Sequence, residues 1–197
     1  EEGEDLQAYG RWCVLAEKYG PSWDQWPAHA ADETVDPRRV EFYTWLQWIF
    51  DEQLEHVQRE LLRAGMKIGV IQDLAIGVHP FGADTWAMGD LLTQGFRVGA
   101  PPDMFSPAGQ DWTQPPWNPL TLAEAEYRPF RDIVRFVMRH AGGLRIDHVI
   151  GMFRLWWIPP GAPATAGTYV RYDHQALIDI LCLEAFRAGV TLIGEDL

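Results

Sequence analysis

Basic residues and cysteines are scarce in this chain, and their scarcity disfavours several classes of function. Lysine and arginine together number 16 against 28 acidic residues, which gives a formal net charge of -12. Such a charge disfavours binding to a nucleic-acid backbone or to an anionic membrane surface. Only two cysteines occur, Cys13 and Cys182, and they are far apart. Neither a disulfide framework nor a cysteine-based zinc site is indicated, so we expect reduced thiols in a cytoplasmic protein with a neutral ligand.

Long apolar runs and clustered histidines are also missing. No uninterrupted apolar stretch approaches the roughly 18 residues that a membrane-spanning helix needs. The six histidines are scattered and form neither a His-Glu-x-x-His motif nor a tight group. The sequence therefore predicts no membrane segment, no metal ion and no cofactor.

What the chain has is enough apolar material for a core, 47% hydrophobic residues, arranged in alternating patterns. Helical spacing is found at about 6–19, 38–63, 122–139 and 174–187, and buried strands are predicted at 66–73, 144–148 and 190–195. This alternation is typical of a parallel α/β sheet. A complete eight-stranded barrel needs about 250 residues. We therefore expect residues 1–197 to be one fragment of a (β/α)8 TIM barrel, incomplete at both ends, with about three strands and long strand-end loops.

Two predicted strands end in acids, Asp147 and Glu195. Arg145 lies two residues before Asp147 and shares its face, so we expect the guanidinium to keep Asp147 ionised; a purely structural ion pair is the alternative. Glu195 is expected to point at the same pocket with a raised pKa, unless it caps a following helix. Paired carboxylates suit glycosidic-bond chemistry, because one attacks the sugar while the other donates and recovers a proton.

A third acid and a long loop extend this candidate site. Asp73 ends the first predicted strand and His79 follows shortly after, which predicts both at the mouth of the barrel; the alternative is a solvated turn acid. The segment at about 98–118 combines prolines and glycines with acidic, amide and aromatic side chains. Aromatic faces stack on pyranose rings, so a sugar-binding loop is one interpretation and a structural covering loop is the other.

Several motifs in order along the chain carry a family resemblance. They are WLQWIFDEQL at 45–54, DLAIGVH at 73–79, GADTW at 82–86, GAPPD at 99–103, GQDW at 109–112, LRIDH at 144–148 and GEDL at 194–197. Together they resemble the 4-alpha-glucanotransferases of the amylomaltase, or disproportionating enzyme, family (glycoside hydrolase family 77). Gln72 and Ala75 depart from the family, which commonly shows Gly and Pro there.

The resemblance implies a role for each matching residue. Asp147 would be the nucleophile that forms a glucosyl-enzyme, Glu195 the acid/base, and Arg145 the residue that orients Asp147. The implied substrate-binding residues are Asp73, His79, Asp103, Phe105, Gln110, Trp112 and His148. The family also uses a third carboxylate from a later His-Asp motif, which these residues do not include, so the fragment alone is expected to be inactive.

The leading hypothesis is a 4-alpha-glucanotransferase that moves a segment of an α-1,4-glucan to the 4-hydroxyl of glucose or another maltooligosaccharide. Maltooligosaccharides and α-1,4-glucans are the expected partners, with no nucleic acid and no membrane. An α-amylase-type hydrolase or debranching enzyme would use the same two carboxylates, and a non-catalytic glucan-binding module is a further alternative.

Overall fold

The computed structural model describes residues 2–195, which fall into two compact units. The first unit contains the residues up to 54 together with 78–89, and the second contains 55–77 and the residues from 90 onward. Helix α2 (Pro37–Arg63) contributes to both units and matches the predicted long helix at 38–63. Asp196, in the GEDL motif, lies outside the described residues.

The first unit packs helix α1 (Glu2–Tyr19), the beginning of α2 and the short helix α3 (Ala83–Met88) around tryptophans. The Trp23 indole N–H donates to Thr85 Oγ at 2.9 Å, and the rings of Trp26 and Trp86 lie 6.3 Å apart. Gly10 allows α1 to approach α2 closely, because a Cβ there would lie 3.0 Å from Val40. These contacts position the segment that carries His79.

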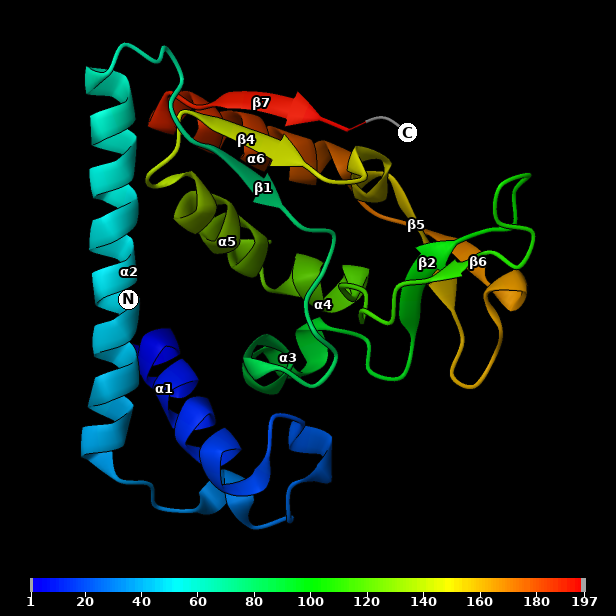
Figure 1. Cartoon of the computed structure of the whole chain (residues 1–197). Helices are drawn as coiled ribbons and strands as arrows, with labels where there is room; N and C mark the ends of the chain where they lie inside the picture. The colour runs from blue at the N-terminus through cyan, green and yellow to red at the C-terminus, as the bar shows by residue number, and fades with distance from the viewer. Residues whose placement is uncertain (1, 196–197) are drawn as a thin grey trace. The chain divides into compact units, whose positions relative to one another are not determined.

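The second unit is built on a three-stranded parallel sheet in the order β1–β4–β7. The strands are β1 (Ile71–Leu74), β4 (Gly143–Ile146) and β7 (Thr191–Gly194), and their arrowheads point the same way in Figure 1. Helices α5 (Arg128–Met138) and α6 (His174–Ala188) pack on this sheet. Leu144 and Val134 are fully buried between them. The predicted parallel α/β arrangement is confirmed.

A second, antiparallel sheet in the order β3–β2–β5–β6 was not predicted. It consists of β2 (Arg97–Ala100), β3 (Gln110–Asp111), β5 (Arg154–Ile158) and β6 (Thr168–Arg171). β3 and all of β2 except Arg97 lie inside the segment at 98–118, which was expected to be a loop. An ion pair from Arg97 Nε to Asp111 Oδ2 at 2.7 Å ties β2 to β3. Strands this short depend on such partners from distant segments, so periodicity alone does not reveal them.

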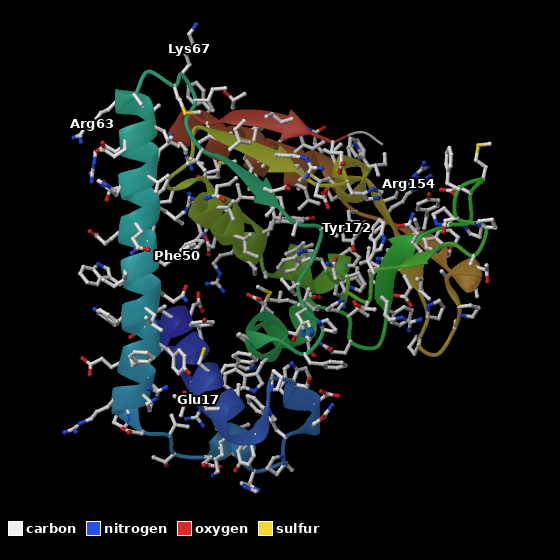
Figure 2. All side chains as sticks on the ribbon, in the orientation of Figure 1. Glu17, Phe50, Arg63, Lys67, Arg154 and Tyr172 are labelled. Atoms are coloured by element: carbon white, nitrogen blue, oxygen red, sulfur yellow. The ribbon has the colours of Figure 1, made fainter. Side chains whose placement is uncertain are left out.

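Tyr172 connects this antiparallel sheet to the segment that precedes α4 (Pro119–Glu124) (Figure 2). Its hydroxyl accepts from the Trp157 indole N–H at 3.2 Å and donates to the carbonyl of Trp117 at 2.9 Å. Burial raises the pKa of Tyr172 well above its usual value, so the hydroxyl remains a donor. The pair of bonds fixes where β5 and β6 lie against the core.

The single helix predicted at 122–139 was wrong, because the segment forms α4 and α5 separately. Glu126 and Tyr127 between them have left-handed backbones with φ of 54° and 55°. A helix cannot continue through such residues. Pro129 then lies in the first turn of α5, where its missing N–H costs nothing. Because apolar residues keep their helical spacing across residues 125–127, the sequence pattern gives no sign of the break between the two helices.

The first strand is also shorter than predicted, beginning at Ile71 instead of Met66. In the segment before Ile71, the backbone hydrogen-bonds to the side chain of Gln58 on α2. Its amide donates to the carbonyl of Ile68 at 3.0 Å and accepts from the N–H of Val70 at 2.7 Å. Within residues 2–195, no helix is long and apolar enough to cross a membrane.

Candidate active site

The acids of the parallel sheet converge where its strands end. The backbone hydrogen bonds between the strands continue one residue beyond the strand ends. Asp147 N donates to the carbonyl of Leu74 at 3.1 Å, and Glu195 N donates to the carbonyl of Ile146 at 3.0 Å. Ile146 is paired with Gly194, so Asp147 and Glu195 are lateral neighbours on adjacent strands. This register brings the two acids side by side at the end of the sheet.

One guanidinium binds carboxylates from all three strands. Arg145 Nη1 lies 2.8 Å from both carboxylate oxygens of Asp73 and 3.1 Å from Asp147 Oδ1. Its Nη2 lies 2.7 Å from Glu195 Oε1. Asp73 therefore contacts Arg145 directly across the β1–β4 pairing, where the sequence predicted only a place at the barrel mouth. The cation stabilises a group of acids that would otherwise repel one another.

The pKa shifts of the two acids are opposite to those expected from the sequence. A hydrogen bond with Glu195, followed by partial burial, raises the pKa of Asp147 above its usual value, and Arg145 only partly opposes this. The pKa of Glu195 is lowered, chiefly because the backbone N–H of His148 donates to Oε2 at 3.1 Å. The hydrogen bond between the two carboxyls and the amide of His148 therefore shift the two pKa values in opposite directions.

His148 and Trp112 are both brought to this site. His148 has a left-handed backbone, with φ 48° and ψ 57°, and burial lowers the pKa of its ring, which is therefore neutral at pH 7. The Trp112 ring meets it edge to face, with the ring centroids 5.2 Å apart. Their predicted contact with a glucan stays a prediction.

The other loop residues are occupied within the loop itself. Asp103 Oδ1 accepts the backbone N–H groups of Phe105 and Ser106, at 2.8 and 2.5 Å, so this carboxylate builds a turn. Gln110 Oε1 accepts the indole N–H of Trp112 at 2.9 Å. Phe105 is 90% exposed. Direct binding of substrate by these side chains stays a prediction.

His79 belongs to the first compact unit, whereas the carboxylates belong to the second. Its Nδ1 accepts the backbone N–H of Phe81 at 3.2 Å, and its carbonyl accepts that of Gly82 at 3.2 Å. The histidine thus shapes its own turn, and its predicted role in binding stays untested. No group of three or more His, Cys, Asp or Glu side chains suited to a metal ion occurs in the described part of the chain.

The sequence matches the family described as 4-alpha-glucanotransferase over residues 1–197. This chain belongs to the 4-alpha-glucanotransferase family. It is 56% identical to the 4-alpha-glucanotransferase of Mycobacterium tuberculosis (strain H37Rv) over 205 aligned positions, which cover 100% of this chain and 28% of the relative. It is 44% identical to the Haemophilus influenzae 4-alpha-glucanotransferase, covering 81% of this chain and 23% of that protein.

Solved amylomaltase structures have the same fold. The amylomaltase from Corynebacterium glutamicum superposes with a TM-score of 0.89 at 46% identity, covering 100% of this chain and 27% of that one. The Streptococcus agalactiae amylomaltase, solved in complex with acarbose, gives 0.85 at 19% identity, covering 100% and 42%. This member of the 4-alpha-glucanotransferase family thus has the α/β fold of amylomaltases and spans about a quarter of the length of the relatives compared.

The sequence did not reveal one feature of the site, the hydrogen bond from the backbone N–H of His148 to the carboxylate of Glu195. The sequence predicted a ligand role for the histidine ring, whereas its backbone N–H is what contacts the acid. A histidine directly after a strand-end aspartate carries no signal of a left-handed backbone, because the conformation depends on the neighbouring strand.

Proposed function

We propose that this chain supplies the nucleophile and the acid/base of a 4-alpha-glucanotransferase that acts on α-1,4-glucans with retention of configuration. The observation that carries the proposal is the lateral pairing of Asp147 and Glu195 on adjacent parallel strands. The two carboxyls hydrogen-bond to each other, and a short separation, roughly 5–5.5 Å between carboxyl groups, is typical of retaining enzymes. Inverting enzymes need a wider gap for a water molecule.

The reaction begins with Asp147 ionised beside Arg145 and with Glu195 protonated. The carboxylate of Asp147 attacks the anomeric carbon of the donor glucan. As the bond from this carbon to the glycosidic oxygen breaks, Glu195 donates its proton to that oxygen and the shortened glucan leaves. Arg145 remains beside Asp147 and Asp73 throughout.

The second half reverses these events with a sugar acceptor. Glu195 removes the proton from the 4-hydroxyl of glucose or a maltooligosaccharide, and this oxygen attacks the anomeric carbon. The bond to Asp147 breaks, and its carboxylate is regenerated. Two inversions at one carbon give net retention. Transfer prevails over hydrolysis where the acceptor site holds sugar in place of water.

The proposal also covers the rest of the barrel and the residues that contact the substrate. We place both compact units in one (β/α)8 barrel domain, whose other strands and third carboxylate come from outside residues 1–197. Trp112, Phe105 and Asp103 are proposed to contact the glucan, together with Gln110 and His79. The relative solved with acarbose supports a carbohydrate ligand for this fold. A cytoplasmic location stays a prediction from the sequence.

A chimera tests the function. This chain replaces the matching segment of the Mycobacterium tuberculosis relative, and the products from maltotriose are separated by chromatography. Glucose together with a ladder of longer glucans is the expected result, and Asp147→Asn and Glu195→Gln should each abolish it. Asp179→Asn, on the exposed face of α6, is the matched control and should leave the ladder unchanged.

Two other outcomes would count against transfer. Reducing ends that accumulate without longer products would favour the hydrolase alternative. No product from the chimera, while the unmodified relative is active in the same assay, would overturn the proposal. Binding of maltooligosaccharide that survives Asp147→Asn in such an inactive chimera would favour the glucan-binding module.

A further inference from the structure

The antiparallel sheet carries two arginines directly opposite each other. Arg154 on β5 is paired with Arg171 on β6, so both side chains leave the sheet on the same side. The next pair along the ladder, Leu155 and Val170, packs against the core. Since successive residues of a strand point to opposite faces, the two arginines point away from the core. Both are exposed, and Arg154 lies at the start of β5 (Figure 2).

This arginine pair, Arg154 and Arg171, has no counter-charge of its own. Like charges directly opposite each other destabilise a strand pair. Within residues 2–195, neither guanidinium forms an ion pair with a carboxylate. The acid closest in sequence, Asp173, caps α6, where its Oδ1 accepts from the N–H of Ala176 at 3.2 Å. An anion bound between the two guanidiniums would remove the repulsion.

Two aromatic rings lie beside the arginine pair on the same face. Tyr169 is opposite Trp156 in the ladder, and their rings meet edge to face with the centroids 5.1 Å apart. The Trp156 indole N–H donates to the carbonyl of Ala164 at 2.9 Å, which fixes that ring. Arg154 Cζ lies 4.6 Å from the centroid of Tyr169, so the tyrosine holds this guanidinium in place. Tyr169 is still 45% exposed, which leaves ring surface for a ligand.

We propose that the arginine pair binds the phosphate monoester of a phosphorylated glucose unit, with Tyr169 against the sugar. Guanidinium groups match the oxygens of a phosphate with paired N–H donors, and a phosphate dianion neutralises both charges. A nucleic acid is the poorer ligand, because the net charge of -12 repels a polyanion. The choice of a sugar rests on the proposed function, whereas the choice of a phosphate rests on the arginine pair alone.

Titration calorimetry of the chain with glucose 6-phosphate tests the site, at low salt and at pH 8, where a phosphate monoester is a dianion. One saturable site is expected. Arg154→Gln and Arg171→Gln should each weaken binding about tenfold, because each removes charge-assisted hydrogen bonds. Both changes relieve a repulsion between strands and should not impair folding.

Arg38→Gln is the matched control for these variants. It removes the same charge from an exposed arginine of α2 and should leave the affinity for glucose 6-phosphate unchanged. The absence of saturable binding to the wild-type chain would overturn the proposal. An equal loss of affinity in Arg38→Gln would also overturn it, because binding would then follow net charge and not the arginine pair.

Inorganic phosphate and maltotriose separate the two halves of the ligand. Glucose 6-phosphate should bind about tenfold more tightly than inorganic phosphate, and Tyr169→Ala should bring the two affinities together. Equal affinities in the wild-type chain would overturn the assignment to a sugar ester. Maltotriose in excess should not displace glucose 6-phosphate, since it has no phosphate. Displacement would place the ligand in the candidate active site and overturn the proposal.

The chimera distinguishes a phosphorylated glucan from a free sugar phosphate. Its migration is compared in native gels that contain either a phosphorylated α-glucan or the same glucan after phosphatase treatment. Stronger retardation by the phosphorylated glucan, lost in Arg171→Gln but kept in Asp147→Asn, would assign the site to phosphate groups on a glucan. Equal retardation, together with the expected binding of glucose 6-phosphate, would assign it to a free sugar phosphate.

The test separates this inference from the proposed function. Binding at the arginine pair needs no catalysis, so an inactive chimera that binds glucose 6-phosphate as expected would refute the proposed function alone. An active chimera whose affinity for glucose 6-phosphate is the same with and without Arg171 would overturn the arginine-pair site alone.

Discussion

Glu184 on α6 is a buried carboxylate whose removal should cost measurable stability. Its side chain is 6% exposed and accepts from Arg135 Nε and Nη2 on α5, at 2.7 and 2.9 Å. Arg187 Nη1 adds a third bond at 2.9 Å. In Glu184→Gln the shape and one acceptor oxygen are kept, while the charge is lost.

The expected loss in the free energy of unfolding is about 2 kcal/mol at pH 7. Breaking a fully buried ion pair costs about 3–5 kcal/mol. Here both arginine side chains are about half exposed, at 46% and 56%, and regain water when the carboxylate is gone. The glutamine oxygen also keeps one acceptor for them. Both effects reduce the cost.

The pH dependence has a definite sign. Hydrogen bonds from Arg135 lower the pKa of Glu184 below its ordinary 4.5. The stabilisation is therefore complete above pH 4.5 and is lost as the pH falls from there through the lowered pKa. The difference between wild type and Glu184→Gln should be constant between pH 7 and 5.5 and shrink towards pH 3.

Urea unfolding followed by far-UV circular dichroism at several pH values measures this difference. Glu60→Gln is the matched control, since its ion pair with Arg63 lies on the surface of α2 and is worth at most about 0.5 kcal/mol. A loss for Glu184→Gln as small as the control, or one that grows as the pH falls, would refute the reasoning.

Three further changes test other parts of the structure. Leu144→Ala removes a fully buried side chain from the central strand and should cost about 3 kcal/mol in urea unfolding; a loss below 1 kcal/mol would mean that the sheet collapses around it. Arg145→Gln removes the cation that favours both carboxylates, so the pKa values of Asp147 and Glu195 should both rise in a 13C NMR titration; a fall in either contradicts the assignment. Asp173→Ala removes the side-chain cap of α6 and should cost about 1 kcal/mol, whereas Asp173→Asn should cost little.

The sequence predicted the parallel sheet because short, mainly apolar segments, each preceded by a glycine, alternate with helical patterns. The meeting of Asp147 and Glu195 followed from one rule, that parallel strands end at the same edge of a sheet. The directions of their pKa shifts did not follow from this rule. They depend on the amide of His148 and on a hydrogen bond between residues far apart in sequence, and neither leaves a mark in local periodicity.

The antiparallel sheet escaped prediction for a related reason. β2 contains Gly99 and runs into Pro101, and β3 has two residues. Such segments have little intrinsic preference for a strand and acquire it from pairing with β5. Likewise, the left-handed Tyr127 interrupts a helical pattern that is otherwise regular across it.

The register of β4 and β7 also limits how this protein can change through evolution. Adding or deleting one residue inside either strand would turn its acid to the opposite face of the sheet. Residues 159–167, which connect β5 to β6, lie between the two acids in sequence but take no part in the ladder between them. Insertions and deletions can accumulate there without separating the catalytic pair, so the hairpin is where relatives are free to diverge in length and acquire new preferences.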